Sequence, residues 1–473
     1  MNSKPAGDLR SATVATRIRL PPPLLIFEPS TPNSSPPYQK KAALIFYRSL
    51  DSFYYNRCAR TSTIMQHHFC PKSFPSTPKD IISDESRRKQ IVIVGAGASG
   101  LFAALSLKRM GVVNVTVLEA SNDIGGRLKA VRPTSSDLTL DVGAEWIHST
   151  DGSRVLNSMM EGLALDGDND ESNKVELITY QPKWYFGKRR SKLMTTIYKE
   201  TKFKSATWYS WLKDNVYEKV KDNVELNSPV SEIRYNNKQE GGEKAVEVVL
   251  ANGEIRTADV LICTVPLGIL KQSIAKDRTS ASASLQFNPA LPIKLQEAIH
   301  AIDMPPGLRV LFQMKEKFYP DLTSANSLFT LLCNPNEMTL AYDATLGKDR
   351  EENILAVVAI GNEHAGKRFG GMSTCEVGEE ALRIVDDLFD GQGTVNLIGE
   401  PLVQDWSEEP FIRGTYTFPG SNRHRRTLGQ SIGESGQVIF AGEHTSMKYY
   451  SLVPGAAYEG RRAALDAVGM MAD

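Results

Sequence analysis

The chain contains 473 residues, equal numbers of basic and acidic side chains, and five cysteines, so its formal net charge at pH 7 is zero. This length accommodates two or three domains, or one large two-lobed enzyme. The balanced charge gives no electrostatic case for a nucleic acid or an acidic partner. Because the cysteines are scattered and form no CxxC pair, they argue against a disulfide framework or a zinc site and indicate a reducing compartment.

The first 88 residues have a composition of their own. Residues 1–90 hold 14 Lys and Arg against 6 Asp and Glu, with Pro-rich patches, Ser/Thr clusters and no sustained periodicity. Residues 1–88 are therefore predicted to be a disordered basic extension. This composition resembles a transit peptide, which would direct the protein to an organelle, a mitochondrion or plastid. The alternatives are an inert tail or translation starting near Met65, and the protein would then be cytoplasmic.

The segment from residue 90 to residue 100 carries the most informative motif. An apolar run, Ile91–Val94, leads directly into Gly95-x-Gly97-x-x-Gly100, and a helical pattern follows. In a dinucleotide-binding unit the first glycine makes the tight turn, the second lets the backbone approach a pyrophosphate, and the third lets helix and strand pack closely. The anion then lies at a helix N-terminus. The apolar stretch Ile91–Leu107 is accordingly predicted to be a buried strand, turn and helix rather than a membrane span.

A second strand is predicted at Val115–Leu118. It ends in Glu119, near the spacing expected of the acid that binds a ribose hydroxyl. Gly125 and Gly126 would bring backbone close to the dinucleotide, and Arg127 can pair with phosphate through its bidentate fork. This local pattern favours a flavin over a nicotinamide cofactor. The alternatives are a glycine turn in some other βαβ unit and, for Arg127, a surface salt bridge.

The remainder of the chain alternates strand-like and helical segments. Residues 141–148 bring a carboxylate, an indole and an imidazole together in Glu145, Trp146 and His148. Residues 440–445 follow a predicted strand and precede a last helix that opens at Pro454. Strands are predicted at Val224–Ile233, Val246–Leu250, Val260–Val265, Leu308–Met314, Leu328–Leu332, Met338–Tyr342 and Ile354–Ile360, and an amphipathic helix at Glu376–Phe389.

Together these motifs resemble those of the flavin-containing amine oxidase family, and within it the polyamine and spermine oxidases. The resemblance covers roughly residues 90–467, and its pieces stand in family order. Any one piece is weak evidence, but eight in order are strong. They are the GxGxxG with Glu119, the run from Glu119-Ala120 to Gly125-Gly126-Arg127, the segment Gly143 to His148, Pro229-Val230-x-x-Ile233, Thr264-Val265-Pro266-Leu-Gly268-x-Leu270, Trp406, Gly414-Thr-Tyr416 and Ala441-Gly442-Glu443-His444-Thr445.

The resemblance implies an α/β fold in which a Rossmann-type FAD-binding domain is interleaved with an α+β substrate domain. The FAD-binding domain would comprise residues 89–150, 223–272 and 406–473. The substrate domain would comprise a helical segment at residues 151–222 and a sheet with helices at residues 273–405. Only about 75 residues separate His148 from Val224, fewer than the family usually has, so the helical segment is predicted to be shortened.

The resemblance further implies FAD as the cofactor. Monoamine oxidases of the family tether flavin through a C-terminal cysteine, but no cysteine follows Cys375 here, so non-covalent FAD is predicted. Val230 would meet the adenine, Glu443 the ribityl–pyrophosphate region and Trp406 the isoalloxazine. The cofactor-binding residues that the resemblance implies are Gly95, Gly97, Ala98, Ser99, Gly100, Glu119, Ala120, Gly125, Gly126, Arg127, Gly143, Ala144, Glu145, Trp146, Val230, Trp406, Gly442, Glu443, Val453 and Ala456.

The activity implied by the resemblance is the oxidation of a polyamine: spermine, spermidine or their acetylated forms. A hydride would pass from the carbon next to the amine to flavin N5, the imine would hydrolyse, and dioxygen would reoxidise the flavin to give hydrogen peroxide. The protein would supply orientation and electrostatics while the cofactor carries the chemistry. The residues predicted to serve catalysis are Arg309, His148, Tyr416 and Trp406.

Two positions depart from the family pattern. Arg309 stands where the family usually has a lysine that holds a water at flavin N5, and arginine is bulkier and keeps its proton. Leu452 stands opposite Tyr416, where a second aromatic ring usually completes a sandwich around the amine, unless a shifted loop lets Tyr450 replace it. Half a sandwich weakens a cation–π contact worth roughly 0.5–2 kcal/mol.

Some alternatives stay open. His148 is either a polar group at the mouth of the pocket or a neutral core histidine, and Glu145 either attracts the cationic substrate or is a solvated loop acid. The protein could instead be a catalytically weak or inactive FAD-binding homologue with a binding or scaffold role, or another FAD oxidoreductase such as a desaturase or protoporphyrinogen oxidase. The histone-demethylase branch usually adds a helical tower and a nucleosome-directed domain, which this sequence does not supply.

Overall fold

The structure, a computed structural model, describes residues 82–133, 137–149, 151–165, 175–180, 183–185, 194–195, 200–238, 244–275, 285–319, 327–334, 337–348, 351–418 and 420–469. All of them belong to the larger of two compact units, Phe46–Asp473. Most of the extension predicted at residues 1–88 lies outside the described residues. Its last part is helical: helix α3 spans Asp84–Arg88, and the Ser83 side chain accepts a hydrogen bond from Ser86 N at its start.

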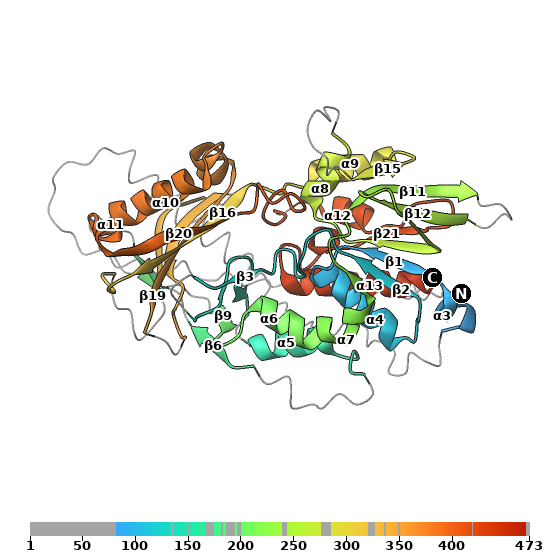
Figure 1. Cartoon of the computed structure of the whole chain (residues 1–473), viewed down its shortest axis with the longest axis horizontal. Coiled ribbons are helices and arrows are strands. Elements are labelled where there is room, and N and C mark those ends of the chain that lie inside the picture. Colours follow the sequence, from blue (N-terminus) through green and yellow to red (C-terminus); the bar gives the residue numbers. More distant parts are fainter. Residues whose placement is uncertain are drawn as a thin grey trace, which may run out of the picture. The chain divides into compact units, whose positions relative to one another are not determined.

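The dinucleotide-binding layer is a five-stranded parallel sheet with two helices. Its elements are β1 (Ile91–Val94), β2 (Val115–Leu118), β10 (Val224–Glu225), β14 (Val260–Cys263), β21 (Val438–Phe440), α4 (Ala98–Arg109) and α13 (Val453–Ala467). The strand order is β10-β2-β1-β14-β21. Strand β1 is buried throughout, as its unbroken β-branched run predicts for a parallel sheet covered on both faces. Helices α4 and α13 pack against each other (Figure 1). A Cβ on Gly460 would lie 2.0 Å from Ser99 O, so only glycine permits this close approach.

A four-stranded sheet with the order β13-β12-β11-β15 contacts this layer. Its strands are β11 (Val230–Lys238), β12 (Lys244–Leu250), β13 (Ile255–Ala258) and β15 (Gln286–Asn288), and the neighbouring helices are α8 (Leu267–Ser273), α9 (Ile293–Ala301) and α12 (Asn422–Leu428). The prediction of one strand at Val224–Ile233 is wrong, because its residues divide between β10 and β11 in different sheets. The chain turns between them at Asn227, whose φ is +54°.

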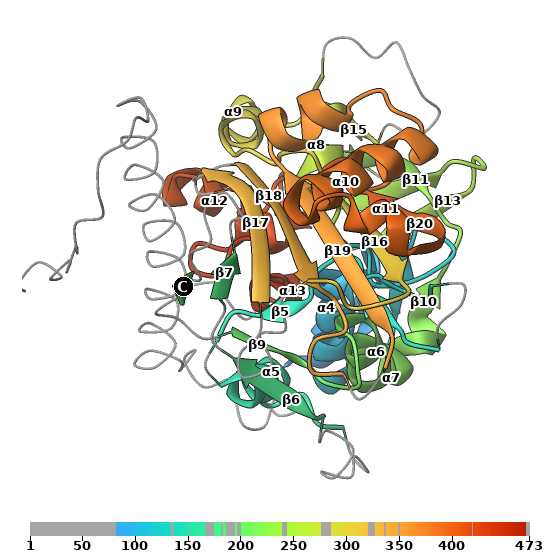
Figure 2. The same cartoon turned by 90° about the vertical axis from the view of Figure 1, so that its left-hand side faces the viewer.

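A seven-stranded sheet forms the second domain, in the order β20-β16-β19-β18-β17-β7-β8. Its elements are β7 (Lys183–Tyr185), β8 (Met194–Thr195), β16 (Gly307–Met314), β17 (Ser327–Asn334), β18 (Glu337–Asp343), β19 (Asn353–Ile360) and β20 (Leu397–Asp405), with helices α10 (Thr374–Phe389) and α11 (Gln392–Asn396). Helix α10 covers β16, β19 and β20 (Figures 1 and 2). It begins two residues before the predicted start, because Ser373 and Glu376 form a capping box.

The connecting segment between the two domains is only partly helical. Its elements are β3 (Ala130–Val131), β4 (Leu140–Asp141), β5 (Trp146–Ile147), α5 (Gly152–Met160), β6 (Leu177–Tyr180), β9 (Glu200–Phe203), α6 (Trp208–Leu212) and α7 (Glu218–Val220). The prediction of a helical segment at residues 151–222 is therefore wrong in part, since β9 is buried between β5 and β6 in a three-stranded sheet. Arg461 of α13 donates to the carbonyls of Met159 and Glu161 at the end of α5.

The chain crosses between the two domains repeatedly. Strands β1 and β2 come before the seven-stranded sheet in the sequence and β21 comes after it, yet all three belong to the parallel sheet. This arrangement confirms the predicted α/β class with a Rossmann-type domain interleaved with an α+β domain. Among the described residues, none of the helices combines the length and the apolar character that crossing a membrane requires.

Candidate active site

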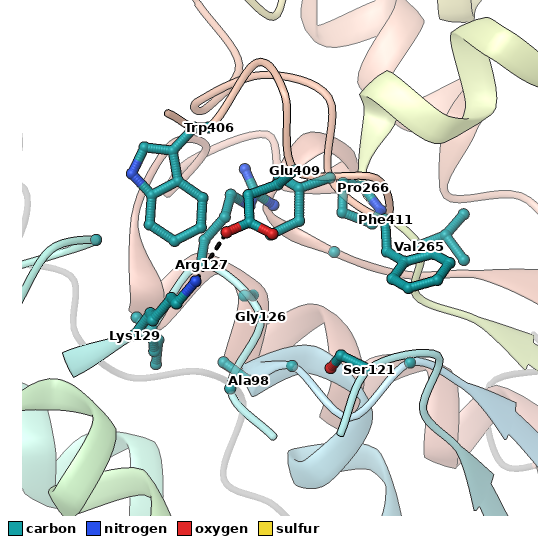
Figure 3. A pocket seen from close by; sticks show the side chains of 18 of the residues that line it. Ala98, Ser121, Gly126, Arg127, Lys129, Val265, Pro266, Trp406, Glu409 and Phe411 are labelled. Atoms are coloured by element: carbon teal, nitrogen blue, oxygen red, sulfur yellow. Dashed lines mark hydrogen bonds and ion pairs between the residues drawn. The ribbon is translucent and has the colours of Figure 1, made fainter. Parts of the chain in front are cut away.

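One cavity of about 470 Å³ opens beyond the carboxyl ends of the parallel strands, where ligands bind in open α/β sheets. Its wall includes all four predicted catalytic residues and every predicted cofactor-binding residue except Gly100. Strands β16 and β19 of the seven-stranded sheet complete the wall with Leu308, Arg309, Val358 and Ile360. Figure 3 shows part of this wall. The sequence motifs are therefore brought together around a single space.

The glycine turn is held by close contacts that leave no room for side chains. Gly95 has a φ of +103°, and a Cβ there would lie 2.8 Å from Thr264 Oγ1. A Cβ on Gly100 would lie 1.9 Å from Gly95 O. Gly100 therefore packs α4 against the turn, which is the role expected of the third glycine, and this packing explains why it does not line the cavity.

The groups at this turn fit the ADP half of a dinucleotide. No side chain caps the first amides of α4 after Gly97. In the described part of the chain, the buried Ser99 Oγ has no hydrogen-bond partner. Glu119 accepts from Ala96 N at 2.7 Å and from the Ser121 hydroxyl at 2.7 Å, and a carboxylate retains further acceptor sites. Helix N-terminal amides without a side-chain cap, together with a hydroxyl that has no partner, suit a pyrophosphate, so the donor set fits FAD.

Arg127 pairs with Glu443 across the cavity wall. Its Nη1 donates to Glu443 Oε1 at 2.9 Å and to Thr415 O at 2.8 Å. The Glu443 side chain, which is 5% exposed, also accepts from the Thr417 hydroxyl and from Ser451 N. Burial alone would raise the pKa of Glu443, but Arg127, His444 and the Thr417 hydrogen bond lower it to about 2. Arg127 thus belongs to an internal ion pair rather than to a surface salt bridge.

Glu145 is a buried carboxylate with three partners. It accepts from Lys202 Nζ at 3.2 Å, from Arg309 Nη1 at 3.1 Å and from the Tyr342 hydroxyl. Burial raises the pKa of Glu145, but Lys202 and Arg309 outweigh it and lower the pKa below its usual range. The interpretation of Glu145 as a solvated loop acid is therefore wrong, because its side chain is buried and forms ion pairs with Lys202 and Arg309.

Arg309 is fixed on three sides. Its Nη1 donates to Asp141 O at 2.6 Å as well as to Glu145. Its guanidinium carbon lies 5.6 Å from the Trp146 ring centroid and 5.7 Å from that of Tyr342, distances typical of cation–π contacts. Burial, followed by the charge of Glu145, raises the pKa of Asp141 to about 8. Hydrogen bonds and cation–π contacts therefore hold the Arg309 side chain in a fixed position in the wall.

Aromatic and aliphatic side chains surround the rest of this end of the cavity. Tyr416, Leu452 and Trp406 line it, and the Trp406 Nε1 donates to Val142 O at 3.2 Å. Tyr450 does not supply the second aromatic ring, because its ring lies 4.2 Å from the Arg425 guanidinium carbon instead. Tyr416 and Leu452 thus both line the cavity, and the half sandwich stays a prediction.

Two polar pairs lie at more exposed parts of the wall. The His148 Nδ1 lies 3.0 Å from a carboxylate oxygen of Glu200, and the His148 side chain is 32% exposed. His148 is therefore a polar group of the cavity rather than a core histidine bonded to backbone. Lys129 and Glu409 form a 2.8 Å ion pair (Figure 3), which joins the glycine-rich segment to the turn that follows β20.

Sequence reasoning missed several residues of this site, among them Glu200, which pairs with His148, and Glu409. Lys202 and Tyr342 contact Glu145, and Lys129 closes the ion pair with Glu409. Tyr342 stands at the end of a correctly predicted strand. Its hydroxyl group is the only feature of the sequence there that indicates a role in a polar site. Lys202 and Lys129 lie in stretches without a motif, so their roles emerge only from the fold.

Comparison with known proteins decides the family. A model of flavin containing amine oxidoreductases matches residues 209–468, which is more than half of the chain. The chain belongs to this family. A model of NAD(P)-binding Rossmann-like domains matches residues 93–163 of this flavin amine oxidoreductase. The resemblance drawn from the motifs is thereby confirmed, and with it FAD-dependent amine oxidation as the general chemistry of the family.

The relatives of this flavin amine oxidoreductase are distant. A corticosteroid-binding protein of Candida albicans is 25% identical, over 80% of this chain and 96% of its own. Polyamine oxidase 1 of Zea mays is 21% identical, over 78% of this chain and 88% of its own. Among solved structures, wild-type putrescine oxidase bound to putrescine superposes with a TM-score of 0.60 at 13% identity, over 81% of this chain and 99% of that one. The last likeness concerns the fold alone.

Proposed function

We propose that this protein oxidises a polyamine with FAD. The observation that carries the proposal is one continuous cavity, whose lining includes the glycine turn and Glu119 as well as Arg309 and Tyr416. Such a cavity accommodates a dinucleotide and a second reactant side by side. The proposed substrate is a polyamine, either free or acetylated. Polyamines are the class named in one relative, polyamine oxidase 1 of maize.

FAD is proposed to bind without a covalent link. Among the described residues that line the cavity there is no cysteine. The α4 amides and Ser99 would hold the pyrophosphate, Glu119 the ribose, and Val230 the adenine. Bound FAD would supply the acceptor for the hydride and the site for dioxygen. Trp406 would lie beside its isoalloxazine ring.

The side chains of this protein would orient the reacting amine and exclude water from it. Leu308 and Tyr416 give the substrate end apolar walls, which exclude water. His148, oriented by Glu200, is proposed to take the proton from the entering ammonium, because the nitrogen must be neutral before a hydride can leave the neighbouring carbon. Arg309 is held rigidly by Glu145 and keeps its charge.

A second candidate is an FAD-binding homologue that turns over amines poorly. Arg309 in place of lysine and Leu452 in place of an aromatic residue favour it. The relative named corticosteroid-binding protein supports a binding role in the same family. The two candidates differ in whether an amine delivers electrons to the flavin.

An anaerobic reduction experiment separates them. The purified full chain, with its flavin absorbance recorded, is mixed without oxygen with spermine, spermidine and their acetylated forms. Bleaching of the flavin band by one of them, followed by stoichiometric hydrogen peroxide when air is admitted, is the expected result. A bound flavin that none of these amines reduces, but that dithionite does reduce, would favour the second candidate. The double variant Arg309→Lys, Leu452→Tyr is the companion measurement, because a weakened but intact site should gain rate from it.

A further inference from the structure

The turn that follows β20 is a compact loop, residues 406–414, and it makes one wall of the cavity. Its two ends meet, because Gly414 N donates to Trp406 O at 2.9 Å. Within this loop Glu409 and Phe411 line the cavity. Figure 3 shows both on the far side of the cavity from Ala98, the first residue of α4. The 406–414 loop therefore faces the helix end at which the pyrophosphate is proposed to bind.

Both ends of the 406–414 loop are anchored to neighbouring elements. At its start, Gly307 N of β16 donates to the Ser407 hydroxyl at 3.1 Å. Near its end, a Cβ on Gly268 of α8 would lie 2.3 Å from Arg413 O, so the helix packs directly against the loop backbone. The ends are thus fixed, and the position of the middle of the loop depends on the contacts that its own side chains make.

Glu409 joins the middle of the loop to the opposite wall. Its carboxylate accepts from Lys129 Nζ at 2.8 Å and from Gln404 Nε2 at 2.7 Å. Lys129 lies just after the glycine-rich turn that carries Arg127. In the part of the chain that the structure describes, no other side chain of residues 407–413 hydrogen-bonds to that segment. Burial raises the pKa of Glu409, but Lys129 and Gln404 outweigh it and hold the pKa below its usual range.

The ion pair lies where the cavity meets solvent. The Lys129 side chain is 43% exposed and that of Glu409 is 28% exposed, whereas the Glu443 side chain in the same wall is buried. Partly exposed ion pairs are weak and are screened by salt. This contact can therefore open and close while the anchored ends of the loop stay in place.

We propose that Lys129 and Glu409 form a strap across the mouth of the cavity, which retains bound FAD and opens whenever the cofactor enters or leaves. The proposal rests on the FAD binding proposed above and not on the identity of the amine. A pyrophosphate at the start of α4 would lie between the glycine-rich segment and the 406–414 loop, the two walls that the strap joins. Because the strap blocks passage in both directions, removing it should speed the release and the binding of FAD alike. A side chain that merely contacts the cofactor would change release much more than binding.

Exchange of FAD in the full chain tests the strap. Release is measured as the loss of radiolabelled FAD from the holoenzyme into excess unlabelled FAD, and binding as the quenching of FAD fluorescence by the deflavinated full chain. We expect Lys129→Met and Glu409→Gln each to release FAD about threefold faster. The double variant should match the single ones, because either change breaks the same contact. Binding should accelerate by a similar factor, so that Kd changes little. Glu408→Gln is the control, because Glu408 pairs with Arg413 within the loop, and it should keep the wild-type rates.

Release rates that stay at the wild-type value in both single variants overturn the inference. Effects that multiply in the double variant, or faster release without faster binding, overturn it as well, because they indicate separate contacts with the cofactor. Reduction of the bound flavin by amines is recorded in parallel. FAD that exchanges as expected but that no amine reduces supports the strap and refutes the proposed amine oxidation. A wild-type chain that binds no FAD refutes both.

Discussion

Arg127 and Glu443 lie 316 residues apart in the sequence, and their side chains meet at 2.9 Å in the wall of the cavity. The pair connects the loop after β2 to the turn after β21. Glu443 has the lower exposure of the two, 5% against 23% for Arg127, so loss of the arginine would leave a buried carboxylate without its cation.

Arg127→Met should therefore destabilise the protein. Removing one partner of a buried, hydrogen-bonded ion pair costs about 2–4 kcal/mol, since the remaining charge stays desolvated. The free energy of unfolding by urea measures the effect. Lys221→Met is the matched control, because its partner Glu218 and Lys221 itself are both solvent-exposed, and such pairs contribute about 0.2–1 kcal/mol. Equal losses in the two variants would contradict the account of Arg127.

Gly97 and Gly100 should respond differently to alanine. A Cβ on Gly97 meets nothing nearer than Gly125 O at 3.8 Å, so the apoprotein has room for Gly97→Ala. If the cofactor approaches this backbone, the variant keeps its stability but loses FAD affinity by at least tenfold. Gly100→Ala, whose Cβ would lie 1.9 Å from Gly95 O, should lose stability with or without FAD.

Flavin fluorescence quenching gives the affinity of Gly97→Ala, and urea unfolding of the apoprotein gives its stability. Unchanged FAD affinity in this variant would place the pyrophosphate elsewhere. A well-folded Gly100→Ala would show that α4 can shift away from the turn.

Arg461 should stabilise helix α5 from a distance in the sequence. Its guanidinium is fully buried and donates to Met159 O at 2.9 Å and Glu161 O at 2.6 Å. The last carbonyls of a helix lack partners within it, so Arg461→Met should leave them unsatisfied and destabilise the protein by about 2–4 kcal/mol. Urea unfolding tests this, with the exposed Arg426→Met as control. A loss below about 1 kcal/mol, the usual net value of one hydrogen bond, would argue against the cap.

The buried His444 imidazole should make the protein sensitive to acid. Burial, together with Arg127 and Arg425, lowers its pKa from 6.5 to about 4 although Glu443 opposes the shift. Between these values the unfolded chain binds a proton that the folded chain does not. Stability is therefore lost as pH falls through this window, by up to about 3 kcal/mol.

The test is the free energy of unfolding from pH 7.5 to pH 4.5 in the wild type and in His444→Phe, which cannot titrate. Asp141 opposes this trend. Its pKa is raised to about 8 in the folded protein, so its contribution to the free energy of unfolding increases as pH falls through the same window. The difference between the two proteins isolates His444. A slope that is the same in both would show that the imidazole does not titrate as described. Glu443, with a pKa lowered to about 2, loses its contribution only below about pH 4.5.

The parts of the fold that the sequence predicts are those encoded locally. Short local patterns are enough to predict the strand Ile91–Val94, the three-glycine turn after it and the capped helix α10. The break at Asn227 has a local signal in Asn227-Ser228-Pro229, a run of turn-forming residues that the prediction of one continuous strand overlooked. Strand β9 was missed because nothing in its sequence, Glu-Thr-Lys-Phe, indicates burial.

The sequence predicts which residues line the site, but not which of them form ion pairs with one another. Motifs locate Glu145 and Arg309, yet the partners that compensate Glu145 come from β9 and β18. Their pairing depends on which strands become neighbours, and that is a property of the whole fold. Predicting the charge balance at Glu145 requires knowing that Lys202 and Arg309 both pair with it.

The interleaved order of the segments has a consequence for synthesis on the ribosome. Strand β14 pairs with β21, and α4 packs against α13, so the first dinucleotide-binding segment has no complete partner until residues 438–467 have emerged. Until then the apolar face of α4 and one edge of the parallel sheet stay uncovered. The parallel sheet is therefore completed only near the end of translation, after every strand of the seven-stranded sheet has already been made.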